Sequence, residues 1–483
     1  MELQISNAEK EGLESGRIEA FISSLKRHDF PLHSILISKN GKIVYEDYAA
    51  PYTKDSLHRM FSTTKSMVSL AIGCLIDAGK LSLDDHIIDY FPEYVDSKNP
   101  DPFLAMLTIR DMLTMRTSRS FNAYKSAKTT DYIKAFFTEK SEYVPGTNWA
   151  YDTSSTHVLS YLVEKLSGKP FLDFLKEAFL NDLGFSKDSY VIPDPSGIGL
   201  GGSGLMASSR DLLRVMLLLR NHGNIDGKQY ISQAYIDAAT SLQSDPFVKA
   251  SFLEESVGYG YQFWITRNGG YAMYGMAGQM AIYDKDTDTI LITTGDCMNI
   301  KGGIQLIYDG FFDYLVNPDF KAQPDAPISK LELPVLSSQA APSIQDNPSN
   351  DEILSLLEAN NGLVFKACPS QNDIKSISLH FKKKDGAFDT GYIEIERENY
   401  KNHINFGIGH NLVDNFEISK LQYAASCAVR AGSCIEIYIQ ILDSSVGSIR
   451  ITCAFRDDYI AVTSRKYVED YYTDFNFVFS GKK

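Results

Sequence analysis

The sequence predicts an α+β fold over roughly its first two-thirds, followed by a separate all-β domain that is either a barrel or a sandwich. Three observations lead to this prediction. Strand patterns occur at both ends of residues 15–315, with helical patterns between them. A proline-rich stretch at 321–350 then interrupts the periodicity. Beyond it, apolar and polar residues alternate with the period of two that half-buried strands show.

The elements of the first domain follow in chain order. Residues 7–28 have the spacing of an amphipathic helix. Ser34–Ser38 and Lys42–Tyr45 flank Asn40-Gly41, which is a strong hairpin signal. Met67–Ile76 is apolar enough for a buried helix. Similar patterns predict the helices Thr156–Ser167, Arg210–Leu219 and Ile304–Leu315 and the strands Gln262–Thr266, Tyr271–Tyr274, Met280–Tyr283 and Thr289–Thr294. We therefore expect one antiparallel sheet formed by both halves of this domain, flanked by helices and a helical subdomain.

The domain boundaries follow from the change in composition and in the periodicity of apolar residues. Residues 1–320 form the first domain, and 321–350, with prolines among Ser, Ala, Gln and Asp, form a linker. Residues 351–483 form the all-β domain, in which Ile435–Ile441 is one of several alternating runs.

Composition limits the classes of function. The chain has 483 residues and a formal net charge of -14, which argues against nucleic acid or an anionic membrane as a partner. No apolar run approaches the ~20 residues that cross a bilayer, and no secretory signal is evident at the N-terminus. Six cysteines without a Cys-x-x-Cys pair suggest reduced thiols in a cytoplasmic protein, and nine scattered histidines predict no metal site. We expect no cofactor.

Ser62-Thr63-Thr64-Lys65 is the most informative short motif. It opens the apolar helix, and residues three apart share one helix face, so Ser62 and Lys65 point the same way. A lysine amine beside a serine hydroxyl can activate it as a nucleophile. The unpaired amide of Ser62 at the helix start could also face a developing oxyanion.

The same spacing recurs at Ser23–Lys26, on an expected surface helix, and at Ser480–Lys483, in the C-terminal tail. The pattern is therefore loose, and its meaning depends on other motifs. Tyr151 follows a Pro145-Gly146 turn and precedes a helix, so its hydroxyl could lie in a cleft and act as a general base; the alternative is a packed or surface tyrosine.

A late glycine-containing strand, Tyr271–Met280, is the third element. Its glycines permit close approach of a substrate, and its free N–H groups could complete an oxyanion hole. A sharply bent structural strand is the alternative explanation.

Taken together, Ser62-x-x-Lys65, Tyr151-x-Thr153 and the late glycine-rich strand occur in the order of the penicillin-recognising serine hydrolases. The chain resembles the class C β-lactamase-like branch, which includes D-alanyl-D-alanine peptidases, esterases and 6-aminohexanoate-dimer hydrolases. Leu107–Thr114 and the Gly201-Gly202 segment extend the resemblance, which covers residues 15–315. It implies a β-lactamase/transpeptidase-like fold.

The resemblance also implies roles for individual residues. Ser62 would be the acylated nucleophile, Lys65 its proton partner, and Tyr151 the residue that activates Ser62 and later the deacylating water. The amides of Ser62 and Gln279 would form the oxyanion hole. Thr153, Met276, Ala277 and Gly278 occupy positions that contact substrate in the family.

Two departures from the family pattern concern the substrate. Thr153 replaces the usual asparagine, and Met276-Ala277-Gly278 replaces Lys-Thr-Gly or His-Thr-Gly, so no cation is available there for a carboxylate. We expect a serine hydrolase that acts on a small ester or amide. The alternatives are a D-alanyl-D-alanine peptidase or weak β-lactamase, and a non-catalytic ligand-binding protein on the same fold.

Overall fold

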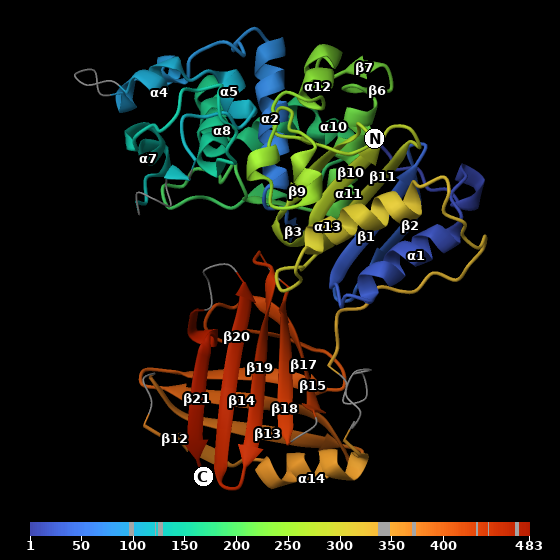
Figure 1. The fold of residues 1–483 in the computed structure, drawn as a ribbon, viewed down its shortest axis with the longest axis vertical. Coiled ribbons are helices and arrows are strands. Elements are labelled where there is room, and N and C mark those ends of the chain that lie inside the picture. The colour runs from blue at the N-terminus through green and yellow to red at the C-terminus, as the bar shows by residue number, and fades with distance from the viewer. Residues whose placement is uncertain are drawn as a thin grey trace. The chain divides into compact units, whose positions relative to one another are not determined.

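The computed structural model describes residues 1–95, 101–120, 122–123, 129–336, 348–369, 373–430, 433–442, 444–468 and 473–483. These residues form two compact units. The first unit comprises Met1–Gly295 and Gly302–Glu332, and the second comprises Asp296–Lys301 and Leu333–Lys483. The first combines helices with a sheet, whereas the second consists mainly of long curved strands (Figure 1).

A six-stranded sheet in the order β2-β1-β11-β10-β9-β8 forms the centre of the first unit. Its strands are β1 (Leu32–Lys39), β2 (Lys42–Tyr48), β8 (Trp264–Ile265), β9 (Tyr271–Gly275), β10 (Gln279–Asp284) and β11 (Thr289–Gly295). β1 pairs antiparallel with both β2 and β11, so both ends of this unit build the sheet, as predicted. Asn40 and Gly41 have φ of 53° and 77°, the left-handed values that a tight hairpin turn requires.

Helices cover both faces of this sheet. α1 (Ser15–Lys26) and α13 (Gly303–Gly310) lie in front of it in Figure 1, and α11 (Ser209–Arg220) lies behind it. α13 continues into a last turn at Phe311–Leu315. β1 is accordingly buried along nearly its whole length, as expected for a strand packed on both faces.

The other helices of the first unit gather beside the sheet around α2 (Thr63–Asp77) and α8 (Thr153–Ser167), which contact each other. They are α3 (Ile87–Tyr90), α4 (Pro102–Met106), α5 (Ile109–Leu113), α7 (Tyr132–Thr138), α9 (Phe171–Leu175), α10 (Asn181–Leu183) and α12 (Gln233–Ala239). Twelve of the fifteen residues of α2 are buried, because other elements surround this helix on all sides. The short strands are β3 (His58–Arg59), β4 (Tyr190–Val191), β5 (Leu205–Ala207), β6 (Asn224–Ile225) and β7 (Lys228–Gln229).

Two elements of the first unit are shorter than predicted. The helix expected over 7–28 is interrupted at Gly12, whose φ of 81° ends a short first turn before α1 begins. The strand expected from Gln262 shrinks to β8, because Gln262 itself has φ of 66°. Its side-chain amide donates to the carbonyls of Met112 and Leu113, at 3.1 and 2.9 Å. These tertiary hydrogen bonds remove Gln262 from the sheet.

Nine strands of the second unit form a closed barrel, in the order β15-β14-β13-β12-β21-β20-β19-β18-β17. A parallel pairing of β15 with β17 closes the ring, and β16 lies on the edge of β17. The strands are β12 (Val364–Ala367), β13 (Ile374–Lys384), β14 (Ala387–Arg397), β15 (Lys401–Ile408), β16 (Leu412–Asn415), β17 (Gln422–Arg430), β18 (Cys434–Ile441), β19 (Gly447–Arg456), β20 (Tyr459–Val468) and β21 (Phe477–Lys482). The predicted all-β domain is therefore a barrel rather than a sandwich.

One helix departs from the all-β prediction for the second unit. α14 (Asn350–Asn360) begins with a capping box, in which Ser349 and Glu352 satisfy each other's backbone N–H groups. Its Leu357 is 1% exposed and belongs to the apolar core of the barrel. The sequence analysis did not predict this short helix, because the alternating pattern of the strands that follow it dominated the interpretation of this region.

The boundary between the units lies at Glu332 and Leu333, inside the stretch that we predicted as a linker, 321–350. The upstream part of that stretch packs on the first unit, where Gly16 N donates to Gln323 O at 3.1 Å and Leu331 N donates to Asp47 at 2.8 Å. Residues 337–347 lie outside the described residues, so the linker as a whole stays a prediction.

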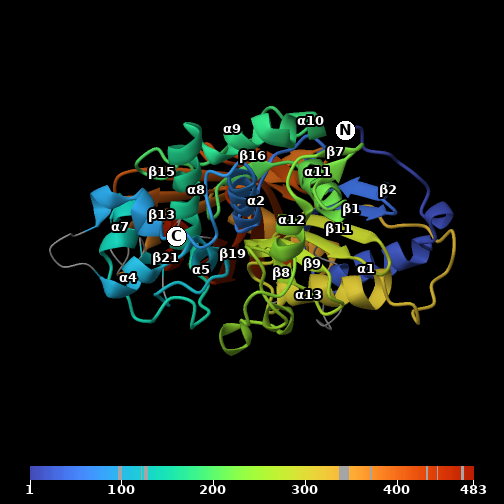
Figure 2. The same cartoon turned by 90° about the horizontal axis from the view of Figure 1, so that it is seen from above.

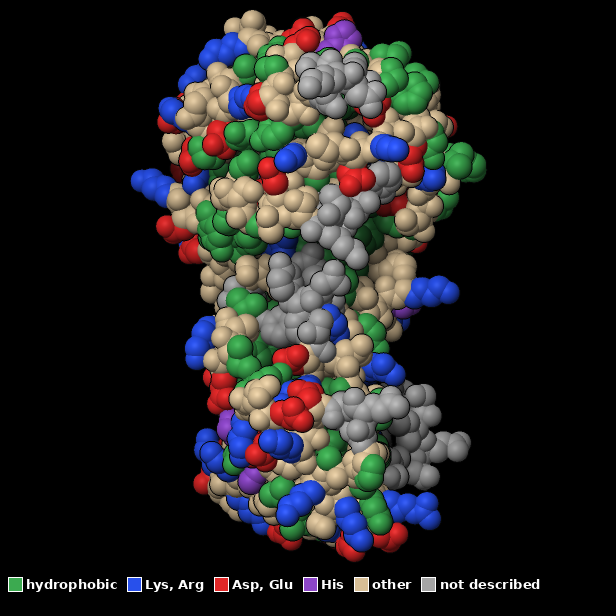
Figure 3. All heavy atoms as spheres, turned by 90° about the vertical axis from the view of Figure 1, so that its left-hand side faces the viewer, with side chains coloured by type: hydrophobic (Ala, Val, Ile, Leu, Met, Phe, Trp, Pro, Cys, Tyr) green, Lys and Arg blue, Asp and Glu red, His purple; other side chains and the backbone are tan. Residues whose placement is uncertain are grey.

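In the described part of the chain, no helix is both long and apolar enough to cross a lipid bilayer. On the face that Figure 3 shows, acidic and basic side chains are interspersed over both units.

Candidate active site

The start of α2 carries the serine and the lysine that the sequence predicts as a pair. Ser62 is the N-cap residue of this helix, and Lys65 lies one turn further along. Lys65 Nζ is 3.0 Å from Ser62 Oγ, which is close enough for direct proton transfer. Lys65 is only 1% exposed, so the pair lies at the border between the interior and the surface.

Close packing fixes the backbone just before Ser62. Phe61 has φ of 45°, a left-handed conformation that costs free energy for a bulky residue. A Cβ added to Gly275 of β9 would lie 2.1 Å from Met60 O and 3.0 Å from Phe61 Cβ. Glycine at 275 therefore lets β9 touch the backbone that leads into α2.

A second contact orients Lys65. Its Nζ donates to the carbonyl oxygen of Gly202 at 2.7 Å. Gly202 in turn lies so close to α8 that an added Cβ would fall 2.3 Å from Thr153 Cγ2. With one N–H held by this carbonyl, a neutral amine can direct its lone pair at Ser62 Oγ.

Tyr151 lies beside Lys65, immediately before the start of α8. Lys65 Nζ is 4.8 Å from the centroid of the Tyr151 ring. Asp152 is the N-cap residue of α8 and accepts a hydrogen bond from Ser154 N at 2.8 Å, which fixes the backbone next to Tyr151. The structure thus brings together the three residues for which the sequence predicts catalytic roles.

Four aromatic side chains adjoin Tyr151 directly or through one another; we call Trp149, Tyr259, Trp264 and Tyr274 the aromatic wall. Trp264 stacks on Tyr151, with ring centroids 5.7 Å apart and an interplanar angle of 24°. Tyr274 continues this arrangement, with its ring 5.1 Å from Trp264. The wall makes one side of Tyr151 apolar, which strengthens electrostatic interactions near it.

Burial also shifts the pKa of Asp152, the residue after Tyr151. It raises the pKa of Asp152 to about 6, although the charge of Arg119 acts in the opposite direction. Arg119 is itself 1% exposed and donates to the carbonyl of Glu139, at 3.1 and 2.5 Å. Its guanidinium is therefore buried and held by the Glu139 carbonyl.

Gln279 begins β10 next to the start of α2. Thr63 Oγ1 lies 3.5 Å from the Gln279 carbonyl oxygen, which places the first residue of α2 beside this strand. The side chain of Gln279 is buried and donates to the carbonyls of Met276 and Gly295, at 2.9 and 3.0 Å. Only its backbone amide could serve the predicted oxyanion hole, and that role remains a prediction.

The four predicted substrate-binding residues differ in accessibility. Thr153 and Met276 are half-buried. Ala277 is 2% exposed and has φ of 69°. Gly278 is buried too, and a Cβ added to it would meet the ring of Phe30 at 3.0 Å. A substrate can therefore reach Thr153 and Met276 more easily than the two residues that follow Met276.

Sequence reasoning missed the Gly202 carbonyl and the aromatic wall as parts of the site. The Gly201-Gly202 pair stands out in the sequence. Every residue has a backbone carbonyl, however, so the sequence does not show which carbonyl will bind Lys65. Trp149 lies two residues before Tyr151, whereas Trp264 reaches it through the fold.

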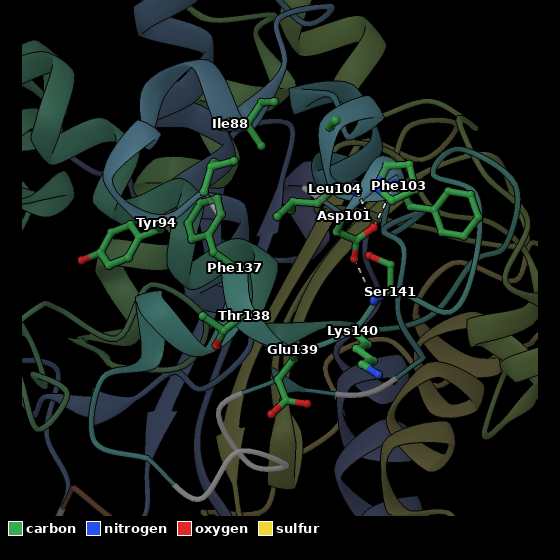
Figure 4. Close-up of a pocket in the computed structure, with 13 residues that line it drawn as sticks. Ile88, Tyr94, Asp101, Phe103, Leu104, Phe137, Thr138, Glu139, Lys140 and Ser141 are labelled. Atoms are coloured by element: carbon green, nitrogen blue, oxygen red, sulfur yellow. Dashed lines mark hydrogen bonds between the residues drawn. The ribbon is translucent and has the colours of Figure 1, made fainter. Parts of the chain in front are cut away.

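A separate pocket of about 540 Å³ opens in the helical part of the first unit (Figure 4). Its lining includes Tyr94, Asp101, Phe137 and Lys140 but none of the three predicted catalytic residues. The Asp101 carboxylate accepts hydrogen bonds from Phe103 N at 2.9 Å and from Leu104 N and Ser141 N. Its charge thus stabilises backbone N–H groups, and we assign no chemistry to this pocket.

Comparisons with known proteins identify the family and agree with the fold. The sequence model of the Beta-lactamase family matches residues 17–295. A 6-aminohexanoate-dimer hydrolase of Paenarthrobacter ureafaciens is 23% identical over 283 residues, covering 54% of this chain and 71% of that protein. The octameric penicillin-binding protein homologue from Pyrococcus abyssi has a TM-score of 0.51 and 18% identity, and the match covers 93% of this chain and 98% of that one. EstCE1, a hydrolase with promiscuous acyltransferase activity, has a TM-score of 0.51 and 15% identity over 62% of this chain and 99% of its own.

Proposed function

The chain belongs to the β-lactamase family of hydrolases, and we propose that it is a serine hydrolase that cleaves an ester or an amide through an acyl-enzyme on Ser62. Membership confirms the family resemblance and the fold class inferred from the sequence. The observation that carries the proposal is the 3.0 Å distance between Lys65 Nζ and Ser62 Oγ, with Lys65 held by the Gly202 carbonyl.

Acylation would begin when Ser62 Oγ attacks the substrate carbonyl carbon and passes its proton to Lys65 Nζ. The carbonyl oxygen then carries the negative charge, and the amides of Ser62 and Gln279 would stabilise it. Collapse of the tetrahedral intermediate breaks the bond to the leaving group. Tyr151 would deliver a proton to the departing oxygen or nitrogen and recover one from Lys65.

Deacylation would repeat these steps with water. Tyr151 would take a proton from the attacking water and pass its own phenolic proton to Lys65, the ester bond to Ser62 would break, and Ser62 Oγ would receive that proton from Lys65. The acid product leaves, and the enzyme returns to its starting protonation state.

The residues at 276 and 277 support a preference for uncharged substrates. A cation in a cleft holds an anionic group through a charge-assisted hydrogen bond worth roughly 1.5–3 kcal/mol, or about ten- to a hundredfold in binding. Met276 and Ala277 supply no such cation. We expect higher kcat/KM for neutral esters and small amides than for penicillins or peptides with a free carboxylate, and Met276→Lys with Ala277→Thr should narrow the difference.

A hydrolysis panel with an active-site label tests the proposal. A fluorophosphonate should label Ser62 and leave Ser23 and Ser480 unmodified, and Ser62→Ala should abolish both labelling and hydrolysis. Labelling that persists in this variant contradicts the assignment. Turnover of a chromogenic β-lactam in preference to neutral esters would favour the β-lactamase alternative, and binding without any turnover would favour a non-catalytic protein.

We also propose that this activity belongs to the cytoplasm. All six cysteines lie within the described residues, and each is a free thiol, which fits a reducing compartment.

A further inference from the structure

Gln262 lies where the sheet meets the helical part of the first unit. It comes two residues before β8, and Figure 2 shows α2 with α5 and α8 on one side of it and β8 and β9 on the other. The side chain is 2% exposed, although an amide is costly to bury unless it is hydrogen-bonded. Its φ of 66° is also unfavourable for a residue other than glycine. Such a conformation persists only where the surrounding structure holds it.

The two oxygen atoms of Gln262 accept hydrogen bonds from the two helices next to the predicted catalytic residues. On α2, Ser66 Oγ donates to Gln262 O at 2.6 Å, and Ser66 follows Lys65 directly. On α8, the helix that follows Tyr151, Thr156 Oγ1 donates to Gln262 Oε1 at 2.8 Å. Gln262 thus joins α2 to α8.

The two nitrogen atoms of Gln262 bind the end of α5. Its backbone N–H and its side-chain amide both donate to Leu113 O, at 3.1 and 2.9 Å, and the side chain also donates to Met112 O at 3.1 Å. A little further along the chain, Met115 O accepts from Ala150 N at 2.9 Å, and Ala150 is the residue before the predicted catalytic tyrosine. The connection therefore extends from Gln262 to the loop in front of α8.

The three predicted catalytic residues depend on this network to different degrees. Ser62 and Lys65 share the start of α2, so the helix alone fixes their spacing. Tyr151 comes from another segment, and the distance of its ring from Lys65 Nζ depends on how that segment packs against α2. Trp264, two residues after Gln262, stacks on Tyr151 with ring centroids 5.7 Å apart. The segment that holds α2 and α8 together thus also contacts Tyr151.

We propose that Gln262 is a positioning residue, which sets the distance between Tyr151 and Lys65 so that protons can pass between them. This inference rests on the proposed hydrolase function and adds to it a residue that touches no substrate. Gln262 is suited to the role because one side chain and one peptide unit hold α2, α5 and α8 at the same point. A fixed distance matters because small displacements of catalytic groups lower the rate strongly.

Removal of the hydrogen bonds of Gln262, together and singly, tests the inference. Gln262→Leu removes all those of the side chain, and kcat for a neutral p-nitrophenyl ester should fall about a hundredfold. Thr156→Val and Ser66→Ala each remove one bond, and each should lower kcat about tenfold. Thr156→Ser keeps the donating hydroxyl and should retain most of the activity. The concentration of working sites is taken from complete fluorophosphonate labelling, so unfolded protein is not counted.

Ser464→Ala is the matched control for Ser66→Ala. Both serines are buried, and Ser464 Oγ donates to Phe475 O at 2.6 Å, the same distance as from Ser66 Oγ to Gln262 O. In the control, kcat should stay within about twofold of that of the unmodified protein, because this bond joins two residues of the second unit.

A Tyr151→Phe background distinguishes positioning from a general loss of structure. Without the phenolic hydroxyl no proton partner is left to misplace, so Thr156→Val should change the residual kcat by less than about twofold. An equal fall in both backgrounds would overturn the inference, and so would normal kcat in Thr156→Val and Ser66→Ala when the unmodified protein is active. If the unmodified protein itself hydrolyses neither esters nor amides, the proposed function fails, and this inference fails with it.

Discussion

Two helices of the first unit carry the same Ser-x-x-Lys spacing in different surroundings. On α1, Ser23 Oγ donates to Glu19 at 2.5 Å, and the exposed Lys26 donates to the carbonyl of Lys330 at 3.0 Å. On α2, Ser62 and Lys65 are 3.0 Å from each other, and Lys65 is buried.

The difference arises from position along the helix and from burial. Ser23 lies inside α1, where its N–H takes part in the helix, whereas Ser62 caps the start of α2. Thr63 N and Thr64 N already donate to the carbonyls of Met60 and Phe61, so the amide of Ser62 itself is the candidate to stabilise an anion. Spacing alone therefore identifies a shared helix face, and the fold decides whether that face can do chemistry.

The largest difference between the two motifs should appear in kcat/KM when each serine is replaced by alanine. Ser62→Ala should lower kcat/KM for a neutral ester by at least about 10³-fold, because no other group can form the acyl-enzyme. Ser23→Ala should stay within about twofold of the unmodified protein. Steady-state kinetics on both variants measures the contrast, and equal losses would show that α2 holds no special site.

Substitution of Lys65 and substitution of Lys26 should differ almost as much in their effect on kcat. Lys65→Met keeps the buried volume but removes the proton acceptor, so kcat should fall about 10²- to 10⁴-fold. Lys26→Met removes an exposed contact and should change kcat little. A Lys65→Met variant with normal kcat would assign proton transfer from Ser62 to another group.

A smaller effect should follow from the glycine that orients Lys65. Gly202→Ala places a methyl group against Thr153 Cγ2 and should displace the carbonyl that holds Lys65 Nζ. We expect kcat to fall about ten- to a hundredfold, as for other small displacements of catalytic groups. Thr153→Ser removes the clashing methyl and should restore part of the activity; no restoration would mean that the loss has another cause.

The segment before Ser62 should also make the free energy of unfolding depend on pH. Burial lowers the pKa of His58 to about 4, from an ordinary 6.5. The folded state therefore rejects a proton that the unfolded chain accepts, so the contribution of His58 is present above pH 6.5 and is lost as the pH falls towards 4. The buried His33 lies 2.9 Å from His58, and its pKa is lowered by burial and by His58, so the two histidines contribute together. The loss over this pH range is on the order of a few kcal/mol.

A difference measurement separates the contribution of the His33–His58 pair from that of Asp152. Asp152, with its pKa raised to about 6, acts in the opposite direction, because its contribution is lost as the pH rises from 3.8 to about 6. The contribution of Asp152 is the same in the unmodified protein and in His58→Asn, so it cancels when their free energies of unfolding are compared. Urea unfolding can be followed by fluorescence, since both tryptophans, Trp149 and Trp264, lie in the first unit. The exposed His28→Asn is the control, and a pH-independent difference would contradict the prediction.

Local sequence predicted the parts of the site that depend on neighbours along the chain. A spacing of three residues was enough to place Ser62 and Lys65 on one turn, and Asn40-Gly41 was enough for the hairpin. The Gly202 carbonyl could not be predicted, because its position depends on close packing against Thr153, and Trp264 reaches Tyr151 only through the fold.

Some errors had a local signal that was overlooked. Gly12 marks the break in the helix expected over 7–28, and Ser349 with Glu352 marks the start of α14. The shortening of β8 has no such signal, since it follows from hydrogen bonds between Gln262 and residues about 150 positions away.

Closure of the barrel has a consequence for how it opens. Among the described residues, β15 and β17 share two residue pairs, and so do β12 and β21, with one further backbone hydrogen bond at each place, whereas β13 and β14 share ten pairs. The barrel thus consists of two curved sheets, β12–β15 and β17–β21, in which neighbouring strands are mostly paired over longer stretches. Only short pairings, β15 with β17 and β12 with β21, join these two sheets. Local opening breaks the fewest hydrogen bonds there. Amide hydrogens at Gly407–Ile408 and Gly481–Lys482 should exchange with solvent deuterium before those in the middle of β13, and the barrel should part into its two sheets before either sheet unravels.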